Sequence, residues 1–332
     1  MGIATKKELF YQMWTFNPIF KSKIWGGDRI PALKNIETEC KEIGESWEIS
    51  GIPGAESVVC GGPDEGLTIT QLIERHGSNL LGRRNYARFG NTFPLLVKII
   101  DAHDDLSVQV HPDDALASEL GMPNGKTEMW YVLAAAPGAR LASGFSRPVD
   151  EAEYEELVSS GRIEEALKFI DVKKGQIFYL PAGRVHTIGR GVLLAEIQQT
   201  SDATFRIYDY RRRDHQGRER ELHTALAAKA IRFDDTEGGP IEPKVNTDIP
   251  VNVVNCPYFT TNILHLDQEV MRDYSEKDTF VVLMATEGEA DIQAGTDTLR
   301  LCKGYTVLIP AQASGVTIIP VGSFTALETY MS

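Results

Sequence analysis

Residues 173–188 read KKGQIFYLPAGRVHTI, and residues 302–318 read CKGYTVLIPAQASGVTI. Both segments contain Lys-Gly, then five mainly apolar residues, then Pro-Ala, and the two copies are offset by 129 residues. A repeat of this kind predicts two related β-domains within one chain. The first copy continues to a histidine, His186, after its Pro-x-Gly turn, and the second copy does not. The sequence therefore predicts a duplicated scaffold in which one copy carries the active site.

Short runs rich in β-branched and aromatic residues extend outward from this motif over most of the chain. Turn residues separate these runs, and strands at this spacing are typical of a β-sandwich or barrel. The predicted strands cover 94–101, 105–111, 128–134, 176–180, 192–198, 278–286, 289–301, 305–309 and 315–328.

Helices are expected to be few. Thr70 is a candidate cap for a helix over 71–81, and Pro112 with two following aspartates is typical of the start of a short helix over 112–120. Residues 149–171 predict a helical pair that is interrupted near 159–161. The charged faces of these segments are best explained as solvated surface.

A linker is expected over 234–250, which holds three prolines and two glycines with little apolar content. We therefore expect residues 1–240 to form a catalytic, metal-binding domain with short helical segments. Residues 241–332 are expected to form a degenerate β-domain without metal ligands.

Composition and charge exclude several classes of function. The chain has 332 residues, and its 34 basic and 47 acidic side chains leave a net charge of −13. This balance argues against a nucleic-acid partner or an anionic membrane surface. No apolar run approaches the ~18 residues of a membrane span, and the N-terminal residues lack the apolar core of a signal peptide. We expect a cytoplasmic protein, either a monomer or a weak homodimer.

Four residues form a candidate metal site. Gln109 and His111 are two apart on a predicted strand and share a face, Glu128 opens another strand, and His186 follows the Pro-x-Gly turn. One amide oxygen, two imidazoles and one carboxylate suit a borderline divalent ion: zinc leads, with manganese, cobalt and iron as alternatives. The four cysteines are scattered, so a thiolate zinc site is not indicated.

The pattern G-x5-P-x-G-x2-H, formed by Gly175, Pro181, Gly183 and His186, resembles the second signature of the cupin fold. Further segments closely resemble the type I, zinc-dependent phosphomannose isomerases, from about residue 15 to residue 225. The resemblance implies a mainly β fold with two cupin-type jelly-roll barrels and a few short helices. The segments that carry it are NPIFKSKIWGG (17–27), GESWEIS (44–50), PLLVKIIDAHDDLSVQVHPDD (94–114), GKTEMWY (125–131) and LPAGRVHTIGRGVLLAEIQQTSDATFRIYDY (180–210).

The resemblance implies one zinc ion per chain and the interconversion of mannose 6-phosphate and fructose 6-phosphate through an enediol. It places the metal ligands on the four residues reached above. It further implies a catalytic, electrophilic role for Arg206, acidic pocket positions at Glu196 and Asp202, and phosphosugar binding by Ser107, Lys98 and Lys126. Glu128 is preceded by Gly-Lys-Thr, where many relatives have His-Lys-Pro.

Several alternatives remain at this level. The catalytic base is Glu196, Asp202 or His103, and Arg211 is a further candidate for contact with the anionic substrate. An iron-dependent oxygenase of the cupin class would use two histidines and one carboxylate, without an amide ligand or a basic cluster. A non-catalytic phosphosugar-binding protein and an isomerase for a related sugar are the other hypotheses.

Overall fold

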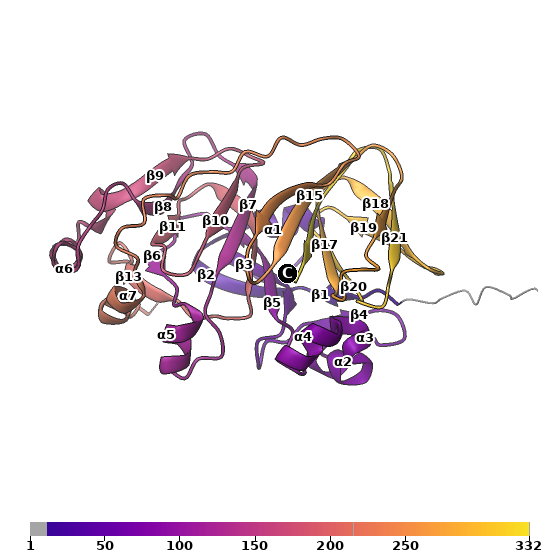
Figure 1. Ribbon diagram of the computed structural model, residues 1–332. Coiled ribbons are helices and arrows are strands. Elements are labelled where there is room, and N and C mark those ends of the chain that lie inside the picture. The colour runs from indigo at the N-terminus through magenta and orange to yellow at the C-terminus, as the bar shows by residue number, and fades with distance from the viewer. Residues whose placement is uncertain (1–11, 215, 332) are drawn as a thin grey trace, which may run out of the picture. The chain divides into compact units, whose positions relative to one another are not determined.

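The computed structural model describes residues 12–214 and 216–331 and divides the chain into two compact units (Figure 1). The first barrel unit comprises Pro18–Ala55 and Pro94–Pro243, and the second barrel unit comprises Met1–Asn17, Glu56–Phe93 and Lys244–Ser332. The later division falls at the end of Pro243, inside the predicted linker. Residues 56–93, by contrast, are grouped with the C-terminal strands.

Two sheets form the first barrel unit. One has the strand order β10-β7-β12-β5-β3-β2, and the other has the order β13-β6-β11-β8-β9. All the pairings are antiparallel. The strands are β2 (Ile19–Gly27), β3 (Ile43–Ser50), β5 (Leu95–Asp101), β6 (Val108–Val110), β7 (Glu128–Ala135), β8 (Arg140–Phe145), β9 (Leu167–Asp171), β10 (Ile177–Leu180), β11 (His186–Ile188), β12 (Val192–Gln199) and β13 (Phe205–Tyr208).

Strand β12 is buried along its whole length, because β5 and β7 flank it. Apolar side chains such as Trp130, Phe178 and Leu194 form a core cluster in this unit. A second cluster contains Phe145 and Tyr154, and partly buried residues of the helical segments pack against it.

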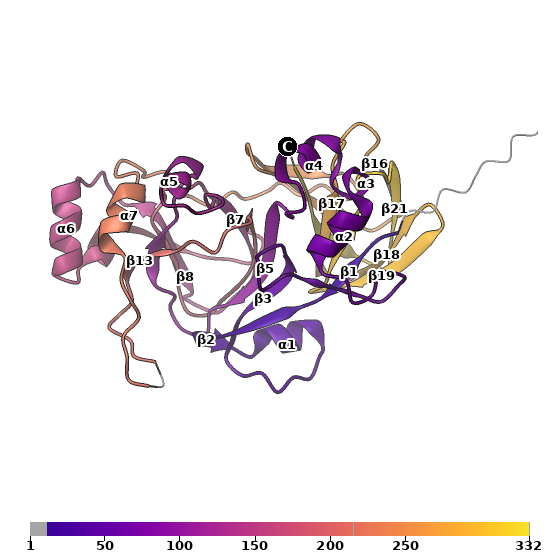
Figure 2. The same cartoon turned by 90° about the horizontal axis from the view of Figure 1, so that it is seen from below.

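Short helices decorate this unit: α1 (Arg29–Lys34), α5 (Asp114–Glu119), α6 (Glu151–Ser159), η1 (Ile163–Ala166) and α7 (Thr224–Ala230). Helices α6 and α7 lie side by side (Figure 2), and Tyr154 donates a hydrogen bond to the carbonyl of Thr224. The helical pair predicted over 149–171 is wrong in its second half. Gly161 has φ +71°, and β9 follows the short η1 turn because it pairs with β8.

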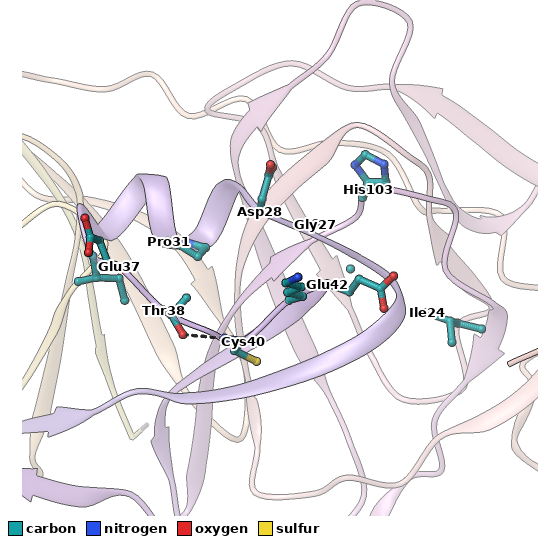
Figure 3. Close-up of a pocket in the computed structure, with 12 residues that line it drawn as sticks. Ile24, Gly27, Asp28, Pro31, Glu37, Thr38, Cys40, Glu42 and His103 are labelled. Atoms are coloured by element: carbon teal, nitrogen blue, oxygen red, sulfur yellow. Dashed lines mark hydrogen bonds between the residues drawn. The ribbon is translucent and has the colours of Figure 1, made fainter. Parts of the chain in front are cut away.

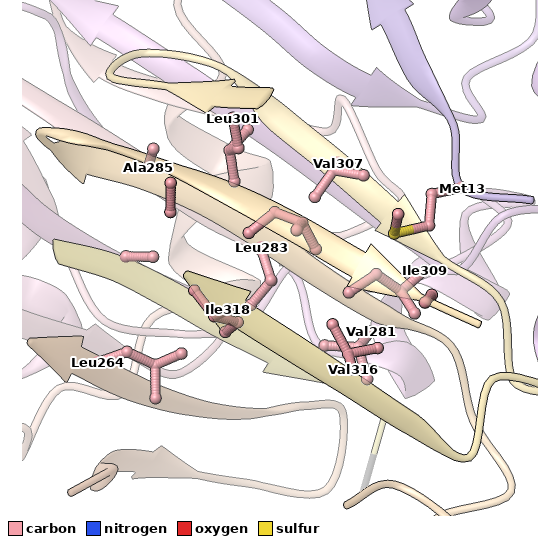
Figure 4. Packing of buried hydrophobic residues seen from close by; sticks show 14 of the residues in the cluster. Met13, Leu264, Val281, Leu283, Ala285, Leu301, Val307, Ile309, Val316 and Ile318 are labelled. Atoms are coloured by element: carbon pink, nitrogen blue, oxygen red, sulfur yellow. The ribbon is translucent and has the colours of Figure 1, made fainter. Parts of the chain in front are cut away.

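The second barrel unit repeats the two-sheet layout, with orders β14-β15-β22-β17-β20 and β16-β21-β18-β19. Its apolar core contains Leu283, Val307 and Ile318 between the two sheets (Figure 4). The molecule is therefore mainly β, with two cupin-type barrels, as predicted. The strands are β14 (Val251–Asn255), β15 (Thr260–Leu266), β16 (Val270–Asp273), β17 (Val281–Glu287), β18 (Glu289–Ala294), β19 (Asp297–Cys302), β20 (Thr306–Ile309), β21 (Gly315–Pro320) and β22 (Phe324–Tyr330).

Segments from early in the chain complete this unit: β1 (Thr15–Asn17), β4 (Val58–Cys60), α2 (Ile69–His76), α3 (Ser78–Leu81) and α4 (Arg83–Phe89). The cap of α2 is Thr68, not the predicted Thr70, because Thr68 and Gln71 form a reciprocal capping box. Gly77, with φ +52°, ends α2 at His76, so the predicted single helix is two. Within the described residues, no helix is long and apolar enough to cross a membrane.

Candidate metal centre and substrate pocket

Strand ends in the first barrel unit position the four metal-ligand candidates. Gln109 lies in β6, His111 lies just beyond that strand, β7 begins at Glu128 and β11 begins at His186. In the register of the sheet, His186 is opposite Gln109. The turn before β11 needs glycine at position 183, where φ is +88° and an added Cβ would lie 2.9 Å from the carbonyl oxygen of Ala230.

Three of these side chains converge on one point. The ligand atoms of His111, Glu128 and His186 all lie within 4.8 Å of one another. The Nε2 atom of His111 is 3.4 Å from Glu128 Oε2, and that of His186 is 3.5 Å from Glu128 Oε1. Each side chain is at most 2% exposed.

Backbone carbonyls orient both imidazoles for metal binding. His111 Nδ1 is 2.8 Å from the oxygen of Ala203, and His186 Nδ1 is 2.9 Å from that of Arg184. A carbonyl accepts, so each Nδ1 donates and each Nε2 carries a lone pair. The Nε2 atom of His111 also lies 3.1 Å from Lys126 Nζ. Burial lowers the pKa of His111 to about 3, helped by Lys126, and burial also lowers the pKa of His186. Both rings are therefore neutral, the form that binds a metal.

Glu128 provides the clearest test of whether a cation fits. Burial alone would raise its pKa, but Lys126, His111 and His186 together outweigh burial and keep the pKa well below the ordinary range. Both carboxylate oxygens are buried without a hydrogen-bond partner among the described residues, although Lys126 Nζ lies 3.2 Å from Oε2. An ionised carboxylate left in this condition is costly. A divalent cation between it and the two imidazole lone pairs fits this donor set.

The fourth candidate reaches the same point with its amide group. Gln109 Nε2 is 3.2 Å from His186 Nε2, and Ser107 Oγ donates to Gln109 Oε1 over 3.4 Å. Rotating the amide by half a turn exchanges its nitrogen and oxygen, which would aim the oxygen toward the imidazole. The side chain thus has the reach that a fourth ligand needs.

A pocket of about 270 Å³ is lined by Gln109 and by Lys126, whose Nζ is 3.1 Å from His111 Nε2. Its lining contains six of the residues proposed from the sequence for the substrate and the chemistry: Lys98, Ser107, Lys126, Glu196, Asp202 and Arg206. Three further charged residues line it that the sequence analysis did not single out: Lys23, Glu45 and Arg220.

Glu196 and Lys98 form a buried ion pair at one side of the pocket. Glu196 is opposite Lys98 in the register of β12 and β5, and Lys98 Nζ is 3.0 Å from Glu196 Oε1. Trp130 Nε1 donates to Glu196 Oε2 over 2.9 Å. Burial and the nearby charge of Glu128 raise the pKa of Glu196 despite its lysine partner. A raised pKa makes this carboxylate a stronger base than an ordinary glutamate.

The neighbouring carboxylate, Glu45, behaves in the opposite way. It lies 3.0 Å from Lys23 Nζ and 3.8 Å from Lys98 Nζ, and Trp47 Nε1 donates to it over 2.6 Å. These partners outweigh burial and lower the pKa of Glu45 to about 2. Glu45 is therefore a permanent counter-ion and not a proton carrier.

His103 and Arg211 do not line this pocket. His103 borders a larger hollow of about 750 Å³ beside α1, together with Asp28 and Glu42 (Figure 3). Arg211 is exposed and has φ +55° in the turn after β13. Of the three candidate bases, Glu196 and Asp202 are thus the two that line this pocket.

Buried histidines and a carboxylate at the end of a cupin-type barrel, below a pocket lined by lysines and arginines, define a metal-binding enzyme site of the cupin class. Residues 13–134 match the family model for the phosphomannose isomerase type I catalytic domain, and residues 251–326 match the mannose-6-phosphate isomerase cupin domain. The chain belongs to the type I phosphomannose isomerase family.

Individual relatives agree with this assignment. A mannose-6-phosphate isomerase of Bacillus subtilis is 34% identical over 89% of this chain and 92% of its own length. One of Streptococcus mutans is 35% identical over 87% of this chain and 89% of its own length. The crystal structure of the mannose 6-phosphate isomerase from Bacillus subtilis has a TM-score of 0.85 at 32% identity, covering 96% of this chain and 99% of that chain. The apo form of the Salmonella typhimurium enzyme, at 18% identity and a TM-score of 0.74, shares the fold.

Proposed function

We propose that the protein is a mannose-6-phosphate isomerase, which interconverts mannose 6-phosphate and fructose 6-phosphate. The reaction moves a proton between C2 and C1 of the open-chain sugar through an enediol. The observation that carries the proposal is the convergence of His111, Glu128 and His186 beneath a pocket lined by Lys98, Lys126 and Arg206. Relatives named for this activity align with most of the chain, which supports the same substrate.

We assign one zinc ion per chain to Gln109, His111, Glu128 and His186. A histidine- and carboxylate-rich set is typical of catalytic zinc, and other divalent metals fit the same donors. When bound, the metal would polarise and orient the oxygens of the sugar as a Lewis acid.

The protein's own side chains would carry the remaining chemistry. Glu196 is the candidate base, because its raised pKa and burial favour proton exchange; it would take the proton from C2 and return it to C1. Asp202 is the second candidate and lies exposed at the same pocket. Arg206 would stabilise negative charge on the carbonyl oxygen, as a fixed guanidinium can.

Three polar residues are proposed to bind the phosphosugar. Ser107 lies beside Gln109, while Lys98 and Lys126 are buried at the pocket floor with Glu196 and Glu128 as their carboxylate neighbours. Their positions suit contacts with sugar oxygens close to the metal. We also propose a cytoplasmic monomer or weak homodimer in which residues 1–240 supply the chemistry and residues 241–332 a structural barrel.

The test is a coupled assay that follows the conversion of mannose 6-phosphate to fructose 6-phosphate before chelation, after chelation and after zinc is added back. Turnover that chelation removes and zinc restores supports both the reaction and the metal requirement. Absence of turnover with metal bound would contradict the proposal. A parallel assay on other six-carbon and five-carbon phosphosugars then separates a related isomerase from a protein that binds phosphosugars without turnover.

A further inference from the structure

Three arginines surround one carboxylate at the edge of the substrate pocket. Asp209 is buried and accepts hydrogen bonds from Arg220 Nε over 2.6 Å, from Arg220 Nη2 over 2.5 Å and from Arg212 Nη2 over 2.5 Å. Arg206 is near enough that Arg220 and Arg212 add to the lowering of its pKa by burial. Asp104 is a second neighbour, with its Oδ2 3.6 Å from Arg212 Nη1, so the group holds three guanidinium charges against two carboxylates.

The chain path explains why residues so far apart in the sequence meet here. Arg206 N donates to His223 Nδ1 over 3.1 Å, and His223 N donates to the Arg206 carbonyl over 2.7 Å. These bonds close residues 206–223 into a loop, whose far end returns Arg220 to the pocket that Arg206 lines. Tyr210 and Arg211, both with φ near +55°, make the sharp turn at its start.

The three lysines of the same pocket are already matched with carboxylates. Lys98 pairs with Glu196, Lys23 pairs with Glu45, and Lys126 pairs with Glu128, at 3.0, 3.0 and 3.2 Å respectively. Arg206 has no ion pair among the residues that the structure describes, and its Nε is buried without a hydrogen bond. The surplus positive charge of the pocket thus lies on the arginine side.

The guanidinium of Arg220 is held so that one of its donor groups remains available at the pocket. Its side chain is 24% exposed, and Asp209 engages its Nε and Nη2 edge. In the described part of the chain Nη1 of Arg220 donates no hydrogen bond, so its two N–H bonds are available to a ligand. A guanidinium fixed along one edge, with the other edge free, is a common arrangement for recognising a phosphoryl group.

We propose that Arg220 binds the phosphoryl group of the substrate, with Asp209 as the positioning residue that fixes its guanidinium and Arg206 adding to the local positive field. The inference rests on the proposed function and deepens it, because it identifies the residue that distinguishes a phosphosugar from the free sugar. It also accounts for how an acidic chain concentrates positive charge where a dianion must bind.

The experiment compares Arg220→Gln with Arg213→Gln, a matched change on the same loop. Arg213 is exposed, pairs with Glu219 at 2.9 Å and does not line the pocket. Binding of inorganic phosphate to the metal-loaded protein is measured by calorimetry, and KM and kcat are measured with mannose 6-phosphate. For Arg220→Gln we expect phosphate affinity to fall and KM to rise by roughly tenfold to a hundredfold, with metal content and kcat little changed. Arg213→Gln should match the unmodified protein.

Equal phosphate affinity in the two variants would overturn the inference, whatever the turnover. If the unmodified protein binds phosphate through Arg220 but does not turn over mannose 6-phosphate, the anion site stands and the proposed reaction fails. Arg220→Lys keeps a cation and should recover part of the affinity, which a loss of folding would not allow. Asp209→Asn should raise KM less than Arg220→Gln; a larger fall in kcat than rise in KM would contradict its role as a positioning residue.

Discussion

Glu196 and Glu328 occupy the same place in the two barrels. Glu196 lies in β12, opposite Lys98 of β5 and Trp130 of β7. Glu328 lies in β22, opposite Asn262 of β15 and Leu283 of β17, which are the corresponding neighbours in the second sheet order. Both carboxylates are buried inside their own barrel unit.

Their surroundings shift the pKa values of these two carboxyl groups in opposite directions. Glu328 accepts hydrogen bonds from Asn262 Nδ2, from Nε and Nη2 of Arg272 and from the Tyr274 hydroxyl. Although burial opposes ionisation, these donors lower the pKa of Glu328, whereas burial and Glu128 raise the pKa of Glu196. The same strand position therefore supports a fully satisfied structural anion in one barrel and a carboxyl group able to exchange protons in the other.

The positions of the candidate metal ligands differ more completely. Val281 is opposite Ile309 just before Pro310, as Glu128 is opposite Leu180 just before Pro181. Gly315 follows Pro310 by the same interval that separates His186 from Pro181, and Asp273 is its partner where His186 has Gln109. An apolar side chain and a glycine thus replace the carboxylate and the imidazole, so the second barrel keeps the scaffold without the donor set.

The largest effect is expected when the equivalent positions His186 and Gly315 are each changed to alanine. His186→Ala should remove bound metal and lower turnover by roughly a thousandfold or more, because one imidazole ligand is lost from a buried site. Gly315→Ala is the matched control, since an added Cβ there would approach no atom more closely than 4.0 Å. It should leave both properties unchanged. Metal analysis and the isomerase assay decide it; full metal content in His186→Ala would refute the ligand assignment.

Arg206→Ala separates the chemistry from the metal. We expect normal metal content and a fall in kcat of roughly a hundredfold to a thousandfold, the usual cost of removing one donor from a developing oxyanion. Arg218→Ala, on the exposed part of the same loop, serves as the control. Near-normal turnover of Arg206→Ala would contradict the electrophilic role.

The paired glutamates predict a contrast between stability and activity. Glu328→Gln should lower the free energy of unfolding by about 3 kcal/mol, because it leaves Arg272 without its counter-ion. Metal content and turnover of the folded fraction should not change. Glu196→Gln should destabilise less and lose turnover. Urea unfolding and the isomerase assay measure the two effects, and the idea fails if Glu328→Gln loses activity without losing stability.

The opposite pKa shifts predict a smaller effect with pH. The folded-state pKa of Glu328 lies below its ordinary value of 4.5, so its contribution to stability is complete above pH 4.5 and is lost as pH falls through the folded-state pKa. The difference in unfolding free energy between the unmodified protein and Glu328→Gln should therefore shrink as pH falls below about 4.5. Urea unfolding at several acidic pH values checks this, and a constant difference would rule it out.

The contrast between the barrels also shows which features of the fold and the site could be predicted from the sequence. The repeat around Pro181 and Pro310 predicted two barrels with one active copy, and strand periodicity placed Gln109 and His111 on one face. Capping was less predictable, because Thr68 and Thr70 are both good caps and the reciprocal bond with Gln71 decided between them. The segment 167–171 became a strand because β8 was available to pair with it, a tertiary effect that local propensity does not contain.

The part of the site that the sequence did not predict depends on contacts between residues that are far apart in the sequence. Arg220 stands in a polar stretch that is typical of surface, and its place at the pocket follows from the contact between Arg206 and His223. Lys23 and Glu45 lie on paired strands whose register the local pattern did not define. The Arg-Glu-Leu-His segment at 220–223, fourteen residues after Arg206, is the signal that could have suggested such a closure.

The second barrel unit has a consequence for synthesis of the chain. Met13 packs into its core and donates its backbone N–H to Asp297, and Trp14 pairs with Leu308 of β20. These partners leave the ribosome almost 300 residues after Met13, an interval of roughly 15 to 60 s at 5–20 residues per second. During that time the chain's early apolar residues lack their final partners, while the first barrel unit, complete by Pro243, is free to fold. The second barrel unit is thus the last part of the molecule that can close.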